Sequence, residues 1–94
     1  MVITVKYLVK VRIDEIFSLK QKRSEINRLK TAVKRFYDSC VIESNFQDSL
    51  KYICLAIAFF CTSPDEVNSI TEKISVLIEN TCEGIIEEEY VDYI

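Results

Sequence analysis

Residues 52–66, YICLAIAFFCTSPDE, place a strand directly before a helix. Residues 52–62 are apolar at both odd and even positions, which is typical of a strand that is covered on both faces and lies inside a sheet. Ser63 then offers a hydroxyl N-cap, Pro64 fits the first helical position, and Glu66 completes a capping box. The stretch therefore predicts a central strand followed at once by a helix.

Three further elements are predicted on the N-terminal side. Residues 2–13 alternate between apolar odd positions and mainly polar even positions, which indicates a strand with one buried face. Ser18 and Gln21 form a second capping-box pattern, and the apolar residues that follow at helical spacing predict an amphipathic helix that ends near Tyr37. Residues 40–47 form a weaker strand pattern.

The C-terminal part completes the fold prediction. Apolar residues recur at helical spacing as far as Ile78, and Gly84, the only glycine, marks the turn out of this helix. Residues 85–94 form a last strand with an acidic run typical of a sheet edge. This βαββαβ order predicts an α+β, ferredoxin-like sandwich of one antiparallel four-stranded sheet with two helices on one face. We expect a single domain, 1–94.

The composition narrows the class of protein. Hydrophobic residues are 49% and charged residues 29%, which suits a globular chain. Neither a signal peptide nor an apolar run approaching the ~20 residues of a membrane span is visible, so we expect a cytoplasmic protein without a membrane partner. The four cysteines include no Cys-x-x-Cys pair, and we expect reduced thiols that hold no metal and no cofactor. They are Cys40, Cys54, Cys61 and Cys82.

The same residues argue against common enzyme chemistry. The chain has no histidine, so it cannot form a Ser-His or Cys-His pair, and its single glycine cannot build a phosphate-binding loop. Glu87, Glu88 and Glu89 are consecutive on a predicted strand, where neighbouring side chains point to opposite faces and do not converge on one metal ion. We expect a protein that is not an enzyme.

The first predicted helix carries most of the positive charge. Residues 1–36 hold ten Lys and Arg against three Asp and Glu, whereas residues 37–94 hold two against twelve. Cations at the start of a helix oppose its dipole, and together with free backbone N–H groups they suit a phosphate or another anion. The candidate nucleic-acid or anion site is Lys20, Lys22, Arg23, Arg28, Lys30, Lys34 and Arg35. A solvated helix face explains the same charges, and Lys22, on the apolar stripe, would then extend to solvent or pair with a carboxylate.

The sheet face without helices is a candidate dimer interface. Strand alternation places small or apolar residues there: Leu8, Cys54, Ala56, Ala58 and Phe60. The pattern lacks the glycine and aromatic residues with which RNA-recognition motifs stack bases. An open, partly apolar face is not expected to stay exposed on a monomer, so we expect a homodimer.

Several segments resemble a known family. Residues 18–23, SLKQKR, are similar to the S-L-K-x-K-R signature of the YlxP-like family, small bacterial proteins of unknown function. Further similar segments are Arg35-Phe36, Glu43 with Gln47-Asp48, and residues 55–58, LAIA. Ala56 stands where the family usually has Gly, and Phe46 where it often has His. The resemblance implies a ferredoxin-like fold with no known activity, and the family's frequent gene neighbourhood of translation factors favours RNA or the ribosome.

Three functional hypotheses follow from these observations. The first is a non-enzymatic module that docks ribosomal RNA or a ribosomal particle through the basic first helix, with phosphate contacts that weaken with salt. The second is a dimeric structural or regulatory module whose partner is a protein, in which a basic helix of one copy could also meet the acidic last strand of another. The third, weaker hypothesis is a small phosphorylated ligand near Ser18 and Lys22.

Overall fold

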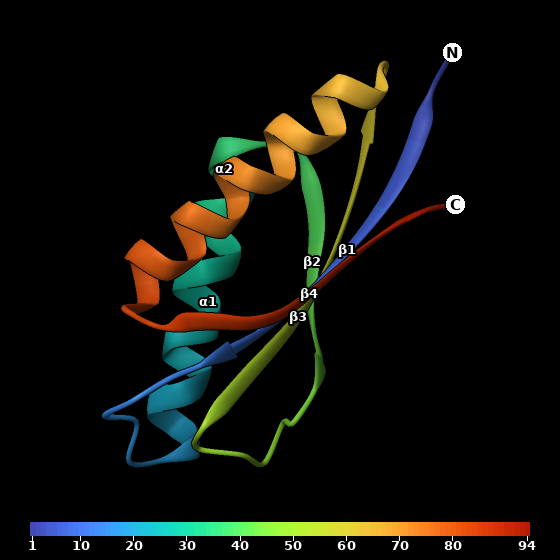
Figure 1. The fold of residues 1–94 in the computed structure, drawn as a ribbon. Helices are drawn as coiled ribbons and strands as arrows, with labels where there is room; N and C mark the ends of the chain where they lie inside the picture. Colours follow the sequence, from blue (N-terminus) through green and yellow to red (C-terminus); the bar gives the residue numbers. More distant parts are fainter.

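The computed structural model describes residues 1–94 and contains the six predicted elements in the predicted order (Figure 1). Their bounds differ from the sequence-based ones by two residues at most. They are β1 (Ile3–Arg12), α1 (Leu19–Phe36), β2 (Ser39–Asn45), β3 (Tyr52–Cys61), α2 (Pro64–Cys82) and β4 (Ile85–Tyr93). The four strands form one antiparallel sheet in the order β2-β3-β1-β4, which confirms the predicted α+β, ferredoxin-like βαββαβ fold.

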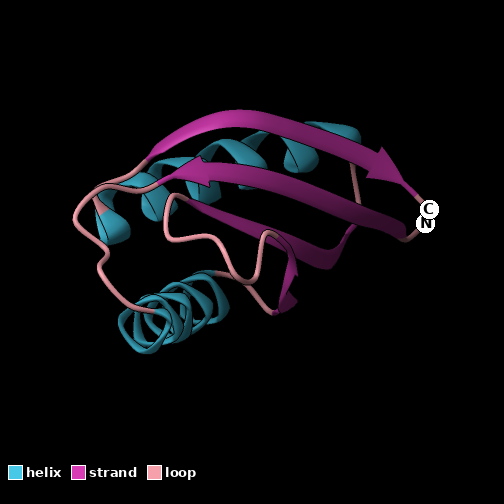
Figure 2. Ribbon diagram, turned by 90° about the horizontal axis from the view of Figure 1, so that it is seen from below, coloured by secondary structure: helices cyan, strands magenta, loops and turns pink.

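Both helices lie on the same face of the sheet and leave the other face open (Figures 1 and 2). α1 contacts β2, whereas α2 contacts β1, β3 and β4. The two most hydrophobic strands, β1 and β3, are central, as their sequences predict, and β2 and β4 are the edges. Neither helix is long and apolar enough to cross a membrane.

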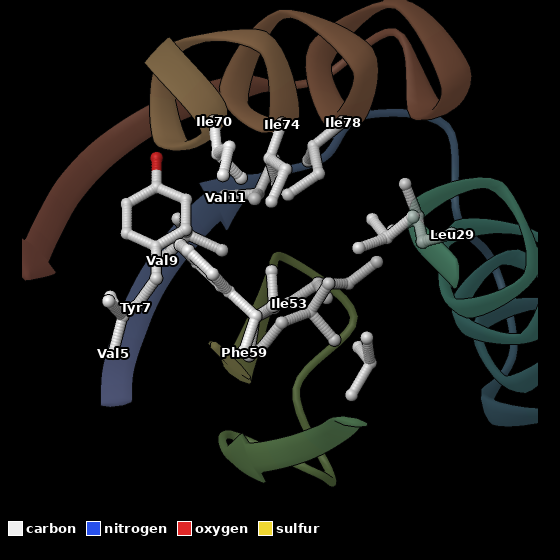
Figure 3. Packing of buried hydrophobic residues seen from close by; sticks show 14 of the residues in the cluster. Val5, Tyr7, Val9, Val11, Leu29, Ile53, Phe59, Ile70, Ile74 and Ile78 are labelled. Atoms are coloured by element: carbon white, nitrogen blue, oxygen red, sulfur yellow. The ribbon is translucent and has the colours of Figure 1, made fainter. Parts of the chain in front are cut away.

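The core lies between the helices and the sheet. Ile70, Ile74 and Ile78 of α2 point toward Val11 of β1, while Leu29 of α1 approaches from the other side (Figure 3). All five side chains are buried. Burial of a Val, Leu or Ile side chain contributes about 1.5–3 kcal/mol. Burial of the apolar stripe of each helix is therefore the main contribution that holds the helices on the sheet. The buried face of β1 consists of its odd-numbered residues, as the alternation predicts.

Both predicted N-caps form. The hydroxyl of Ser18 accepts a hydrogen bond from the backbone N–H of Gln21 (3.1 Å), and that of Ser63 accepts one from Glu66 (3.3 Å). The side chains of Gln21 and Glu66 accept from the residue before the cap rather than from the cap itself, so each box is one residue wider than the sequence pattern predicts. The two helices thus start in the same way.

The end of α2 differs in detail from the expectation for Gly84. The left-handed residue that ends the helix is Glu83, with a φ of 54°, and Gly84 follows it without a positive φ. A Cβ atom on Gly84 would lie 2.7 Å from Cγ1 of Val11 and 2.8 Å from the carbonyl oxygen of Arg12. Glycine is therefore required here by the close approach of β1, because no side chain fits between the two segments.

Candidate functional site

The outer side of α1 presents a continuous basic surface. Four of its cations are exposed and one, Lys30, is half-buried. The first turn of the helix contains no acidic residue. Residues three, four, seven and eleven apart share a helix face, and this spacing joins Lys20, Arg23, Lys30 and Lys34 on the side away from the apolar stripe. Arg35 lies at the edge of this face toward α2, where it lines a hollow with Lys73. We call this surface the basic face of α1, and it consists of Lys20, Arg23, Lys30, Lys34 and Arg35.

Arg28, a further residue of the predicted site, is engaged within the chain. Its guanidinium lies 2.9 Å from Oε2 of Glu25 and donates a hydrogen bond of 3.2 Å to the carbonyl oxygen of Thr81. Thr81 belongs to the last turn of α2, where backbone carbonyls lack partners within the helix. Arg28 therefore joins the two helices. Its pairing also neutralises Glu25, the only carboxylate of α1.

Lys22 lies apart from the basic face. Its side chain is 1% exposed, and Nζ donates to the carbonyl oxygen of Phe46 and lies 3.4 Å from Oε2 of Glu43. Glu43 is on the helix-facing side of β2, and Phe46 begins the β2–β3 connection with a φ of 55°. Lys22 thus ties the start of α1 to that connection. Of the alternatives that the sequence leaves open, the structure contains the pairing with a carboxylate.

The chain itself caps one backbone N–H group at the start of α1. The hydroxyl of Ser18 accepts from Gln21, and its carbonyl oxygen accepts from the N–H of Lys22. Because the Lys22 ammonium also turns inward, the structure does not gather the groups of the expected phosphorylated-ligand site near Ser18. The cations that remain toward solvent here are Lys20 and Arg23.

The open sheet face contains all five residues of the predicted dimer interface. Phe60 is 65% exposed, Ala58 is exposed, Leu8 and Ala56 are half-buried, and Cys54 is buried. Two exposed residues of this face, on the edge strands, are not among those predicted from the sequence. They are Ile42 of β2 and Tyr90 of β4, 60% and 57% exposed. Alternation assigns each residue to one face of its own strand. Which residues of the other strands lie beside it depends on the register of the sheet, which the sequence does not show directly.

One end of the open face combines a cation with aromatic rings. Nζ of Lys10 lies 4.9 Å from the ring centroid of Phe46 and 4.4 Å from that of Tyr52. These contacts help to cover Cys54, which pairs with Lys10 in the register. Burial raises the pKa of the Cys54 thiol, while the charges of Lys10 and Lys22 partly oppose that shift. A thiol in this setting stays protonated and is a poor nucleophile.

Tyr7 is the most perturbed titratable group. Its side chain is fully buried, and its hydroxyl donates to Oε1 of Glu89 at 3.3 Å. Burial and then the charge of Glu89 raise the pKa of Tyr7 well above its ordinary value. The phenol is therefore a hydrogen-bond donor at every physiological pH, and it anchors β4 rather than supplying a base.

A family model described as "Protein of unknown function (DUF503)" matches residues 4–90, which is nearly the whole chain. The chain belongs to the DUF503 family. Membership of DUF503 supports the expectation of an uncharacterised family but assigns no activity to the basic face of α1 or to the open sheet face. No curated protein matches this sequence.

Two solved structures share the architecture of this DUF503 protein. The de novo designed protein Foldit4 is 14% identical over 100% of this chain and 97% of its own, with a TM-score of 0.54. The At3g17210 protein of Arabidopsis thaliana is 12% identical over 96% of this chain and 92% of its own, with a TM-score of 0.53. At such low identity these likenesses concern the fold alone, so function has to be argued from surfaces of this DUF503 chain.

Proposed function

We propose that this DUF503 protein is a non-enzymatic binding module that docks ribosomal RNA or a ribosomal particle through the basic face of α1. The observation that carries the proposal is the row of five cations on that face with no free carboxylate among them. Arg28 already pairs with Glu25, the only acidic residue of the helix. Such a surface suits contacts to phosphate oxygens, which give strong affinity with weak sequence preference.

The distribution of charge supports one orientation of docking. α1 lies on the β2 side of the sheet, whereas β4, with its acidic residues 87–89, forms the opposite edge. The net charge of −3 therefore hides a strong separation of the two signs. A polyanion is attracted to one edge of the molecule and repelled from the other, which directs the basic face of α1 toward RNA.

Two finer assignments belong to the same proposal. The segments similar to the YlxP-like signature lie in α1, β2, the β2–β3 connection and β3. We infer that the chain is a YlxP-like member of its family that acts in the cytoplasm. The alternative function is a dimeric structural or regulatory module with a protein partner and no nucleic acid. The exposed apolar residues of the open sheet face, Phe60 above all, favour that alternative.

Fluorescence anisotropy of labelled ribosomal RNA fragments tests the proposal. If about four phosphates are neutralised, the affinity should fall roughly 50- to 150-fold between ~50 and ~200 mM salt, because each contact contributes a salt slope of about −0.7 to −0.9. The double variant Lys20→Glu/Lys34→Glu should abolish binding at the lower salt. It should also leave the circular dichroism spectrum unchanged, because both side chains are exposed.

A matched control separates location from total charge. Lys51 is an exposed cation outside both α1 and the open sheet face, and Lys51→Glu changes the net charge by the same amount as Lys34→Glu alone. Lys73 does not serve, because it lines a hollow with Arg35 of the basic face. We expect Lys51→Glu to retain most of the affinity and Lys34→Glu to lose much of it. Equal losses in these two single variants, or no binding of the unaltered protein at ~50 mM salt, would contradict docking through α1.

A further inference from the structure

The open sheet face has a ridge and a groove that lie side by side. Along β1 its central side chains are long, whereas along β3 they are small. The antiparallel register sets each long side chain beside a small one: Lys6 pairs with Ala58, Leu8 with Ala56 and Lys10 with Cys54. The low part of β3, which we call its groove, consists of Ala56 and Ala58, between exposed Phe60 at one end and the covered Cys54 at the other.

We propose that a second copy of this chain covers the open face, turned about a two-fold axis that runs parallel to the strands between β1 and β3. This axis places the β1 ridge of each copy over the β3 groove of the other, so that Leu8 faces Ala56 of the second copy. A two-fold axis across the strands would set ridge against ridge. Shape therefore favours the axis along the strands.

The edge strands fit the same arrangement. Ile42 pairs with Ala56, and Leu8 pairs with Tyr90, so these four residues form one row across the sheet. Rotation about the proposed axis places the exposed Ile42 of each copy over the exposed Tyr90 of the other. The most exposed apolar side chains of the row therefore cover each other. Facing sheets that pack with roughly aligned strands are a common arrangement in sandwiches.

Charge also makes a second copy a suitable occupant. On this face Lys6 pairs across the strands with Asp92, and Lys10 pairs with Glu88. Each lysine therefore has an acidic neighbour within its own sheet, and a second copy meets a nearly neutral surface. The basic face of α1 lacks such neighbours and would repel its own copy. The open face thus suits self-association, and the basic face of α1 suits a polyanion.

The area is sufficient for a specific contact. Four strands about 4.8 Å apart, with up to about nine residues each at ~3.3 Å, give a projected face of roughly 600 Å². Specific interfaces bury about 800 Å² of accessible surface per partner, and the accessible area of a ridged face exceeds its projection. The open face is therefore of the size that a dimer needs.

Sedimentation equilibrium and native mass spectrometry test the proposal with two size changes. The unaltered protein should have twice its 11.0 kDa mass, and the dimer should persist at high salt. Leu8→Ala removes the ridge residue and Ala56→Leu fills the groove, so each should weaken the dimer by about 100-fold, since a two-fold axis repeats each change. Both residues are only half-buried, and circular dichroism should report folded variants.

Mixing the two variants gives the decisive result. In a dimer of one Leu8→Ala copy and one Ala56→Leu copy, the proposed axis sets the two altered positions against each other, so the larger side chain fills the space that the smaller one leaves. The other contact of the same dimer is the native one, Leu8 against Ala56. The mixture should therefore form a heterodimer of near-native affinity that neither variant matches alone. The axis across the strands predicts no such rescue. Val76→Ala, which changes an exposed apolar residue of α2, serves as the control and should leave the mass unchanged.

Four outcomes would overturn the proposal. One is a monomer of 11.0 kDa throughout the concentration series. Another is a dimer that dissociates in high salt, as expected if the basic face of α1 bound the acidic β4 of another copy. The third is a dimer that Leu8→Ala and Ala56→Leu leave intact, and the fourth is a mixture of the two variants that shows no rescue.

Discussion

α1 and α2 begin alike and then differ in charge. Each has a serine N-cap, a polar side chain three residues later that accepts from the residue before the cap, and buried apolar residues toward the sheet. α2 has Asp65 and Glu66 in its first turn, as the helix dipole favours, whereas α1 has cations and no acidic residue there. The fold requires the caps and the stripes in both helices. It does not require the charge of α1, and this difference is what the proposed docking of a polyanion would explain.

The two helices also differ at the fourth helical position. Val67 of α2 is fully buried among apolar neighbours, whereas the equivalent residue of α1 is Lys22, equally buried but paired with Glu43. A buried ion pair contributes little net stability, because desolvation offsets the attraction, but its removal from one side leaves a charge without a partner. The start of α1 thus depends on a polar contact where α2 depends on packing.

The largest expected effect comes from breaking that contact. Lys22→Ala should lower the free energy of unfolding by about 3 kcal/mol, because it removes the buried ammonium that faces the Glu43 carboxylate and donates to the Phe46 carbonyl oxygen. Urea denaturation measures the change. Val67→Ala, the equivalent change in α2, should cost about 2 kcal/mol through lost packing alone.

A second variant identifies the cause. Lys22→Met combined with Glu43→Leu removes both charges and keeps the volume, so it should recover most of the stability lost in Lys22→Ala. If the double variant were as unstable as the single one, packing around the lysine stem rather than the unpaired charge would explain the loss.

The ends of the helices provide an intermediate effect. α1 ends in extended backbone at Tyr37, whereas α2 ends at a left-handed Glu83 followed by the crowded Gly84. Gly84→Ala should destabilise by about 2 kcal/mol, because the new methyl group meets Val11 and the backbone of β1. Glu83→Gly should instead stabilise by about 0.5–1 kcal/mol, since glycine adopts a positive φ without strain. Thermal unfolding of both variants measures these effects. If the two substitutions moved the unfolding temperature in the same direction, the left-handed strain at Glu83 and the crowding at Gly84 would not be separate causes.

The smallest effect tests the charge difference itself. Lys20 and Asp65 both occupy the second helical position, in α1 and α2 respectively. Lys20→Asp should stabilise by about 0.5 kcal/mol and Asp65→Lys should destabilise by a similar amount, because each change reverses a charge near a helix N-terminus. Lys20→Asp should at the same time weaken RNA binding. A gain in stability coupled to a loss of binding is expected where a helix departs from the dipole rule for a functional reason.

Much of the fold could be predicted from local patterns, and the site only in part. The strong caps at Ser18 and Ser63 and the alternation in β1 depend on neighbouring residues, so the sequence indicates them directly. The basic face of α1 follows from helical spacing in the same way. Lys22 and Arg28 have the same residue types as their neighbours, but their partners Glu43 and Thr81 are distant in sequence. Helical spacing does set Lys22 apart, because it lies on the apolar stripe, but no local pattern identifies its partner or distinguishes Arg28 from the free cations.

What the sequence determined by itself is the order of elements, the buried stripes and the separation of charge between the two parts of the chain, because each depends on spacing along one segment. The tertiary structure decided the rest. It turned Lys22 inward, joined Arg28 to α2, made Gly84 necessary through the approach of β1, and aligned Ile42, Ala56, Leu8 and Tyr90 across four strands. These features arise where distant segments meet, and the distances between such segments are set by the register of the sheet and the packing of the helices on it.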